Sequence, residues 1–126
     1  MATPLRLTAG EIRYARVPYT DDPSQGKRRP VIVLGWSKFG FQEDNTVLLV
    51  PISSFDGVPK VKNGDVELDW KACGLNKPSW ARARRIWGAN PHAVDPRPSL
   101  GHVTANEMAL ILLELEAMFM AHGTAR

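Results

Sequence analysis

The chain has 126 residues, and its 16 Lys and Arg side chains outnumber its 13 Asp and Glu side chains, giving a net charge of +3. With 44% hydrophobic and 23% charged residues, its composition is that of a folded globular domain and excludes disordered and fibrous proteins. The sequence also predicts no membrane-spanning helix, no secretory signal and no internal disulfide, because it has no long apolar run, no apolar N-terminal segment and a single cysteine. We therefore expect one cytoplasmic domain over residues 1–126, with residues 1–9 as a short lead-in.

The basic residues are mostly arginine and are unevenly placed. Ten of the 16 are arginine, whose guanidinium can bind a phosphate through two parallel hydrogen bonds. Five basic residues lie within 76–98 against a single acid, whereas 104–119 contains three glutamates and no cation. A basic middle beside an acidic end suggests an anionic partner.

The first half of the chain alternates between strand-like and loop-like segments. Apolar alternation or β-branched runs predict strands at Gly10–Val17, Val31–Leu34 and Thr46–Ile52. Residues 18–30 are rich in turn formers and predict a polar loop, and residues 35–45 predict a second irregular connection. Pro51 is expected at the end of its strand or at a sheet edge, because proline cannot donate to a strand ladder.

The second half closes with a helix. Residues 66–70 alternate apolar and acidic side chains and predict a half-exposed strand, whereas 80–86 fits either a strand with arginines on one face or the start of a helix. Thr104 and Glu107 match a capping box, and Gly123 supplies a stop. Between them, apolar residues recur at helical spacing: Met108, Ile111, Leu112, Leu115 and Phe119. We predict a mainly-β fold, a small barrel or curled sheet capped by this helix, which either closes its own barrel or contributes to a dimer.

Residues suited to phosphate binding gather at the ends of two predicted strands. Lys27, Arg28 and Arg29 precede one buried strand, and Ser53 and Ser54 follow the next. If these strands are neighbours, Arg29 and Ser53 lie close together, where a guanidinium and a hydroxyl would bind a phosphate. A solvated basic loop and a turn that ends the strand account for the same residues. Phosphate-binding glycine loops, zinc-protease motifs and nucleophile elbows are absent from the sequence.

Four short motifs occur in an order that covers nearly the whole chain: Gly10-Glu11-Ile12, Gly26-Lys27-Arg28-Arg29-Pro30-Val31-Ile32-Val33-Leu34, Val50-Pro51-Ile52-Ser53-Ser54 and Lys77-Pro78-Ser79-Trp80. Their order and spacing resemble those of the PemK/MazF-like toxins of type II toxin–antitoxin systems. The resemblance implies a small SH3-like, partly open β-barrel with a C-terminal helix, usually a homodimer. It also implies growth inhibition by metal-independent, sequence-specific cleavage of single-stranded RNA, without a cofactor and blocked by a cognate antitoxin protein.

The resemblance also implies site residues. Arg29 matches the catalytic arginine of the family, and Ser53 stands where many members carry threonine, so the resemblance implies that Arg29 and Ser53 are the catalytic residues. Residues expected to assist in binding RNA phosphates are Lys27, Arg28, Ser54, Arg82 and Arg84. Arg84 stands where some members have an acid, and Pro23 or Ser24 stands where some carry histidine, so no acid–base partner is identified.

Two alternatives remain open at this stage. A catalytically weak or inactive SH3-like module that binds nucleic acid or protein would fit the same sequence. Four aromatic side chains could stack on unpaired bases or instead pack in the core or a dimer contact: Trp36, Phe39, Phe41 and Trp80.

Overall fold

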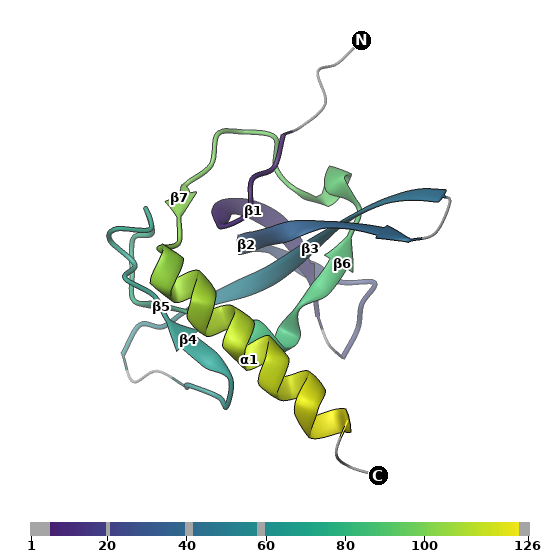
Figure 1. Cartoon of the computed structure of the whole chain (residues 1–126). Helices are drawn as coiled ribbons and strands as arrows, with labels where there is room; N and C mark the ends of the chain where they lie inside the picture. Colours follow the sequence, from purple (N-terminus) through teal and green to yellow (C-terminus); the bar gives the residue numbers. More distant parts are fainter. Residues whose placement is uncertain (1–5, 20, 40–41, 58–59, 124–126) are drawn as a thin grey trace.

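A strongly curved antiparallel sheet carries one helix in the computed structural model, which describes residues 6–19, 21–39, 42–57 and 60–123 (Figure 1). Within these ranges the sheet has seven strands in the order β4-β5-β3-β2-β1-β7, with β6 also paired to β3. The strands are β1 (Glu11–Pro18), β2 (Gly26–Phe39), β3 (Gln42–Ser54), β4 (Asp65–Glu67), β5 (Ser79–Arg82), β6 (Trp87–Ala89) and β7 (Gly101–His102). The helical elements are the 3-10 helices η1 (Ala83–Arg85) and η2 (Pro91–Ala93) and the α-helix α1 (Ala105–Gly123). The predicted mainly-β fold with a C-terminal helix is confirmed.

β1 and β2 form a longer hairpin than the sequence predicts. β2 already begins at Gly26, and Lys27 pairs with Val17 of β1. The predicted loop at 18–30 is therefore too long at its C-terminal end. Composition misled this prediction because the first residues of β2 are polar or charged and lie outside the apolar core, so they look like loop residues although their backbone is paired.

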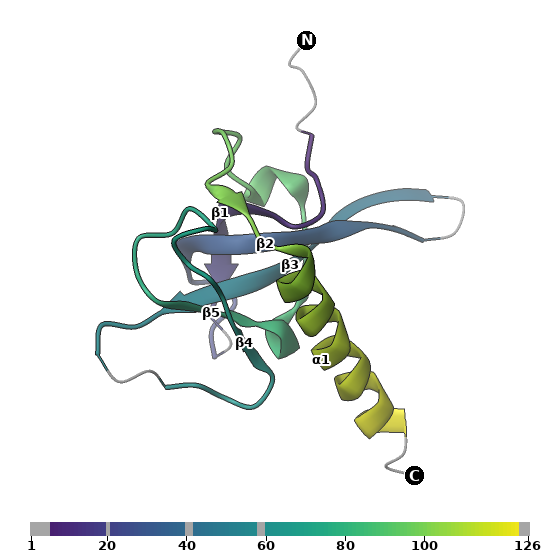
Figure 2. The same cartoon turned by 60° about the vertical axis from the view of Figure 1, so that its left-hand side comes forward.

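The connection predicted at 35–45 is wrong, because β2 continues to Phe39 and β3 begins at Gln42. The far ends of these two strands project from the rest of the sheet as a two-stranded ribbon (Figures 1 and 2). Two register shifts interrupt the pairing, the first between Val33 and Gly35. Such bulges break the two-residue alternation by which a strand is recognised in sequence.

Along its second edge, β3 changes partner. Residues 47–49 pair with β6, and residues 52–54 pair with β5. Pro51 lies between these two stretches, where a missing N–H interrupts neither ladder, and β3 continues beyond it to Ser54. Pro51 therefore does not end its strand, and it marks the point at which the sheet curls from one partner to the next.

Residues 80–86, for which the sequence allows either a strand or the start of a helix, form a strand followed by a short helix. β5 ends at Arg82, and the 3-10 helix η1 follows directly. Because the backbone changes from an extended to a helical conformation here, Arg84 does not continue the face on which Arg82 lies, as it would in an uninterrupted strand. The strand predicted at 66–70 is also shorter than expected, because β4 ends at Glu67.

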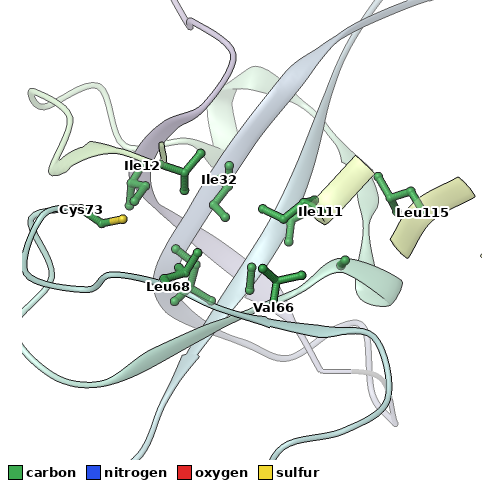
Figure 3. Close-up of a cluster of buried hydrophobic side chains, with 12 residues drawn as sticks. Ile12, Ile32, Val66, Leu68, Cys73, Ile111 and Leu115 are labelled. Atoms are coloured by element: carbon green, nitrogen blue, oxygen red, sulfur yellow. The ribbon is translucent and has the colours of Figure 1, made fainter. Parts of the chain in front are cut away.

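Buried apolar side chains form two clusters, one on each face of β2 and β3. Ile32 belongs to the cluster beneath α1, whereas the adjacent Val31 belongs to the other cluster, as expected from strand alternation. Helix residues Ile111 and Leu115 reach the first cluster (Figure 3). The helix thereby closes one face of the curved sheet.

The predicted capping box is confirmed at the start of α1. Thr104 Oγ1 accepts a hydrogen bond from the backbone N–H of Glu107 at 3.1 Å, and Glu107 Oε1 accepts one from the backbone N–H of Thr104 at 2.7 Å. Glu107 Oε2 accepts a third from the backbone N–H of Asp69 at 2.6 Å. Burial tends to raise the pKa of Glu107, but these backbone hydrogen bonds outweigh it and lower the pKa below its usual value.

The two faces of α1 differ. Ile111 and Leu115 are buried, whereas Leu112 and Phe119 are 52% and 66% exposed, although all four recur at helical spacing. The inner face closes the barrel, which is one of the two roles considered for this helix, and its role in a dimer stays a prediction. In the described part of the chain, no helix is both long enough and apolar enough to cross a membrane.

Candidate functional site

A pocket of about 300 Å³ opens beside the ends of β1, β2 and β3 and beside η1. Its polar lining consists of Tyr19, Asp21, Arg29, Ser53, Arg82 and Arg85. Three of the seven site residues predicted from the sequence are therefore brought together in one cavity.

Strand register explains why Arg29 and Ser53 meet. β2 and β3 are neighbours, and Val31 pairs with Pro51. Continuing that antiparallel register by two residues on each strand sets Arg29 against Ser53 on the same face of the sheet. Ser53 is buried and Arg29 is half-buried, so both side chains lie within the wall of the pocket and do not extend freely into solvent.

Arg82 is held in place by three neighbours. Its Nε donates a hydrogen bond to Ser53 Oγ at 2.6 Å, and its Nη1 lies 3.4 Å from Asp65 Oδ2. The guanidinium carbon stands 5.7 Å from the centre of the Phe55 ring. Sheet pairing accounts for these contacts, because Arg82 lies directly opposite Asp65 on β4, while Ser53 lies opposite Trp80, two residues before Arg82 on β5.

The other two arginines of the pocket are not paired with a carboxylate in the part of the chain that the structure describes. Among the described residues, neither Arg29 nor Arg85 makes an ion pair or a side-chain hydrogen bond. Two uncompensated guanidinium groups in one recess produce a positive potential that attracts an anion. Phosphate oxygens match the forked donor geometry of these groups.

Sequence reasoning missed two of the charged residues of the pocket. Arg85 is one of the five basic residues within 76–98, but the sequence does not assign it to a face, because the strand and helix interpretations of 80–86 point its side chain in different directions. Asp21 is the acidic residue among the described residues of the lining, and it belongs to the loop after β1. Nothing in the sequence distinguishes it from the adjacent Asp22.

Two predicted phosphate-binding arginines lie away from the pocket. Arg28 Nη2 bonds Asp95 Oδ2 at 2.7 Å, and its guanidinium carbon lies 4.2 Å from the centre of the Tyr14 ring. Strand alternation puts Arg28 on the opposite face of β2 from Arg29. Arg84 Nη2 lies 3.5 Å from Glu114 Oε2 of α1.

The two remaining residues predicted to bind phosphate, Lys27 and Ser54, are exposed and are not among the residues that line the pocket. Lys27 lies at the start of β2, and Ser54 is the last residue of β3, on the face opposite Ser53. Trp80 packs its ring against that of Phe55, with the centres 5.2 Å apart and the planes 69° apart. The side chains of the other aromatic candidates, Trp36, Phe39 and Phe41, fall outside the described parts of the chain.

Cys73 lies far from this chemistry, in the core beneath α1. Burial, followed by the nearby Glu107 carboxylate, raises the pKa of the Cys73 thiol to about 12, so the thiol is protonated near neutral pH. Across the ranges that the structure describes, no three His, Cys, Asp or Glu side chains gather in a group that could hold a metal ion.

Comparison with protein families matches residues 8–119 to the PemK-like, MazF-like toxin of type II toxin–antitoxin system. The chain belongs to this family. A search of curated proteins found no match. In this PemK/MazF-family protein, two of the short sequence motifs contribute Arg29 and Ser53 to the same pocket.

Solved structures share the fold of this family member. The Mycobacterium tuberculosis toxin MazF-mt6 superposes with a TM-score of 0.60 at 20% identity, covering 86% of this chain and 95% of that one. MazF from Deinococcus radiodurans gives a TM-score of 0.63 at 18% identity, with 88% and 94% covered. A MazE–MazF structure from the same organism gives 0.59 at 16% identity, with 88% and 92% covered. At these identities the similarity establishes the MazF-like fold.

Proposed function

We propose that this toxin-family protein is an endoribonuclease that cleaves single-stranded RNA at the pocket containing Arg29 and Ser53. One observation carries the proposal: two arginines that make no ion pair with any described residue, Arg29 and Arg85, line the same pocket as a buried serine hydroxyl. The family membership supports a toxin that acts in a type II toxin–antitoxin system. Growth inhibition would follow from destruction of messenger RNA at particular sequences.

The proposed reaction uses a nucleophile within the RNA. The ribose 2′-oxygen attacks the adjacent phosphorus and gives up its proton, while the bond from phosphorus to the 5′-oxygen breaks and that oxygen takes a proton from water. The products are a 2′,3′-cyclic phosphate and a 5′-hydroxyl end. Negative charge grows on the non-bridging oxygens in the transition state, and Arg29 and Arg85 would stabilise it by about 3 kcal/mol for each well-aimed donor.

Asp21 is the group in the pocket lining that could accept the 2′-hydroxyl proton. It is the acidic residue among the described residues of the lining, and it belongs to the loop between β1 and β2. Its proposed role compensates for the positions at which this sequence lacks the acid or histidine that some members carry.

The partners proposed for this chain follow from its family. One solved structure that shares the fold contains MazE with MazF. We accordingly propose a cognate antitoxin that covers the pocket and a homodimer as the active assembly. Non-catalytic binding of nucleic acid is the second candidate function, because Arg82, Arg29 and Arg85 would attract a phosphate backbone whether or not cleavage follows.

The two candidate functions differ in the products they leave. Purified protein should be incubated with a long RNA in EDTA, and the fragment ends should be mapped. Discrete fragments with 5′-hydroxyl ends are expected, and they should disappear in Arg29→Ala. Arg28→Ala is the matched control, since it removes the neighbouring arginine outside the pocket. Intact RNA that is retained in a salt-sensitive complex would instead support the binding module and contradict the nuclease.

A further inference from the structure

Asp65 is a buried carboxylate that contacts Arg82, one of the residues that line the pocket. Its side chain is 4% exposed, and that of its partner Arg82 is 11% exposed. Removing two charges from water costs more than their attraction usually returns, so a buried pair is weak evidence of a stabilising role. A pair of this kind at the edge of the candidate site therefore calls for a role beyond stability.

The contacts of Asp65 form a continuous chain that ends at Ser53. The backbone N–H of Lys62 donates to Asp65 Oδ2 at 2.7 Å, and the backbone N–H of Asp65 donates to Lys62 O at 3.0 Å, which fixes the carboxylate in a tight turn before β4. The same Oδ2 lies 3.4 Å from Arg82 Nη1, and Arg82 Nε donates to Ser53 Oγ at 2.6 Å. Each group in the chain orients the next.

The hydrogen bond from Arg82 limits the directions in which the Ser53 hydroxyl can donate its proton. Ser53 Oγ accepts from Arg82, and within the described residues its own proton has no acceptor. That proton is available to a phosphate oxygen in the pocket. Because a guanidinium donates to the oxygen, the hydroxyl becomes a stronger donor than an isolated serine.

From these contacts we propose that Asp65 is a positioning residue, which holds Arg82 so that Ser53 presents its O–H to the RNA phosphate. The proposal rests on the function proposed above and deepens it by dividing the arginines into two groups. Arg82 is partly neutralised by Asp65 and orients the hydroxyl. Arg29 and Arg85 retain their full charge for the phosphate.

Asp65→Asn tests this role, because the amide oxygen can still accept from Lys62 while the charge facing Arg82 is lost. We expect kcat to fall by about tenfold to a hundredfold, the cost of misplacing a reacting group by a fraction of an ångström to an ångström. KM should change little, since Arg29 and Arg85 remain. Asp56→Asn is the matched control: Asp56 is an exposed carboxylate that pairs with Lys77 at 3.3 Å.

A double-mutant cycle separates positioning from a merely structural role. If Asp65 acts through Ser53, then Asp65→Asn should cost little further activity in a Ser53→Ala background, so the two losses will not multiply. Losses that multiply would overturn the proposal. If Asp65→Asn fails to fold, Arg82→Lys replaces it, because a single ammonium cannot hold Asp65 and Ser53 in the same arrangement. Wild-type kcat in Arg82→Lys would also overturn it.

The controls keep this inference distinct from the function on which it rests. If wild-type protein cleaves RNA, Arg29→Ala does not, and Asp65→Asn cleaves at the wild-type rate, the positioning role alone is refuted. If wild-type protein leaves RNA intact, the nuclease function and the positioning role are refuted together.

Discussion

The arginines considered for phosphate binding differ in whether they pair with a carboxylate. Three of them do: Arg28 pairs with Asp95, Arg82 with Asp65 and Arg84 with Glu114. Arg29 and Arg85 pair with none among the described residues. An arginine that is paired with a carboxylate attracts a phosphate less strongly than an unpaired one. We therefore expect the unpaired arginines within the pocket to contribute most to phosphate binding.

This ranking predicts a contrast between two adjacent arginines. Arg85→Ala should lower kcat/KM for RNA cleavage by about a hundredfold, because it removes an uncompensated donor from the developing charge. Arg84→Ala should change kcat/KM very little, because Arg84 pairs with Glu114 at the surface, where such bridges contribute at most about 1 kcal/mol to stability. Steady-state kinetics on one fluorogenic oligonucleotide measures both. Equal losses in the two variants would argue against the division.

Ser53 permits a test in both directions. Ser53→Ala removes the hydroxyl that Arg82 orients and should lower kcat by about a hundredfold. Ser53→Thr keeps a hydroxyl at the same position on β3 and should retain most of the activity, since threonine suits a strand. Ser54→Ala serves as the control, because Ser54 is exposed on the other face. A Ser53→Ala protein that is as active as wild type would exclude the hydroxyl from the reaction.

At the scale of the elements, signals confined to a few neighbouring residues could be read from the sequence. The capping box at Thr104 needs only Glu107 three residues on, and it is present as predicted. From the sequence, the proximity of Arg29 and Ser53 depends on whether their two strands are neighbours, and the pairing of β2 with β3 meets that condition. The bounds of those strands could not be predicted, because bulges and polar strand ends hide a paired backbone from periodicity.

Arg85 and Asp65 show why the remainder of the site was out of reach. The position of Arg85 depends on where β5 ends and η1 begins. The helix and strand propensities of the residues do not determine that boundary. Asp65 meets Arg82 across a strand pair separated by a long stretch of chain. Such a contact depends on how the strands pair in the folded sheet, so the residues adjacent to Asp65 in the sequence do not predict it.

The start of α1 predicts how stability depends on pH. The folded pKa of Glu107 lies below its usual value of 4.5, so its carboxylate stabilises the fold fully above that pH, and the contribution is lost as the pH falls through the folded pKa. Glu107→Gln should lower the free energy of unfolding by about 1–2 kcal/mol at pH 7. The difference from wild type should shrink at pH 3. Urea unfolding at both values measures it, with the exposed Glu116→Gln as control. A deficit that is independent of pH would contradict this account.

For the molecule as a whole, the core couples the closing helix to the sheet. Cys73 packs in the same cluster as Ile12 of β1, Ile32 of β2 and Ile111 of α1 (Figure 3). Any opening that exposes the thiol must therefore disrupt this cluster, which joins the helix to the sheet. The thiol is thus a natural reporter of the integrity of the fold.

This coupling predicts that Cys73 reacts only when the molecule opens. The side chain is fully buried and its pKa is raised to about 12, so the native thiol is both inaccessible and protonated at pH 8. Labelling by iodoacetamide should be far slower than that of a small free thiol, and it should accelerate with urea in parallel with unfolding followed by tryptophan fluorescence. The unfolded thiol has a pKa of 9.0, so between pH 9 and 12 the unfolded state loses a proton that the folded state keeps, and stability should fall across this range. Cys73→Ala should lose that thiol-dependent part of the decline. Rapid labelling that does not respond to urea would mean that the core around Cys73 opens without unfolding of the rest.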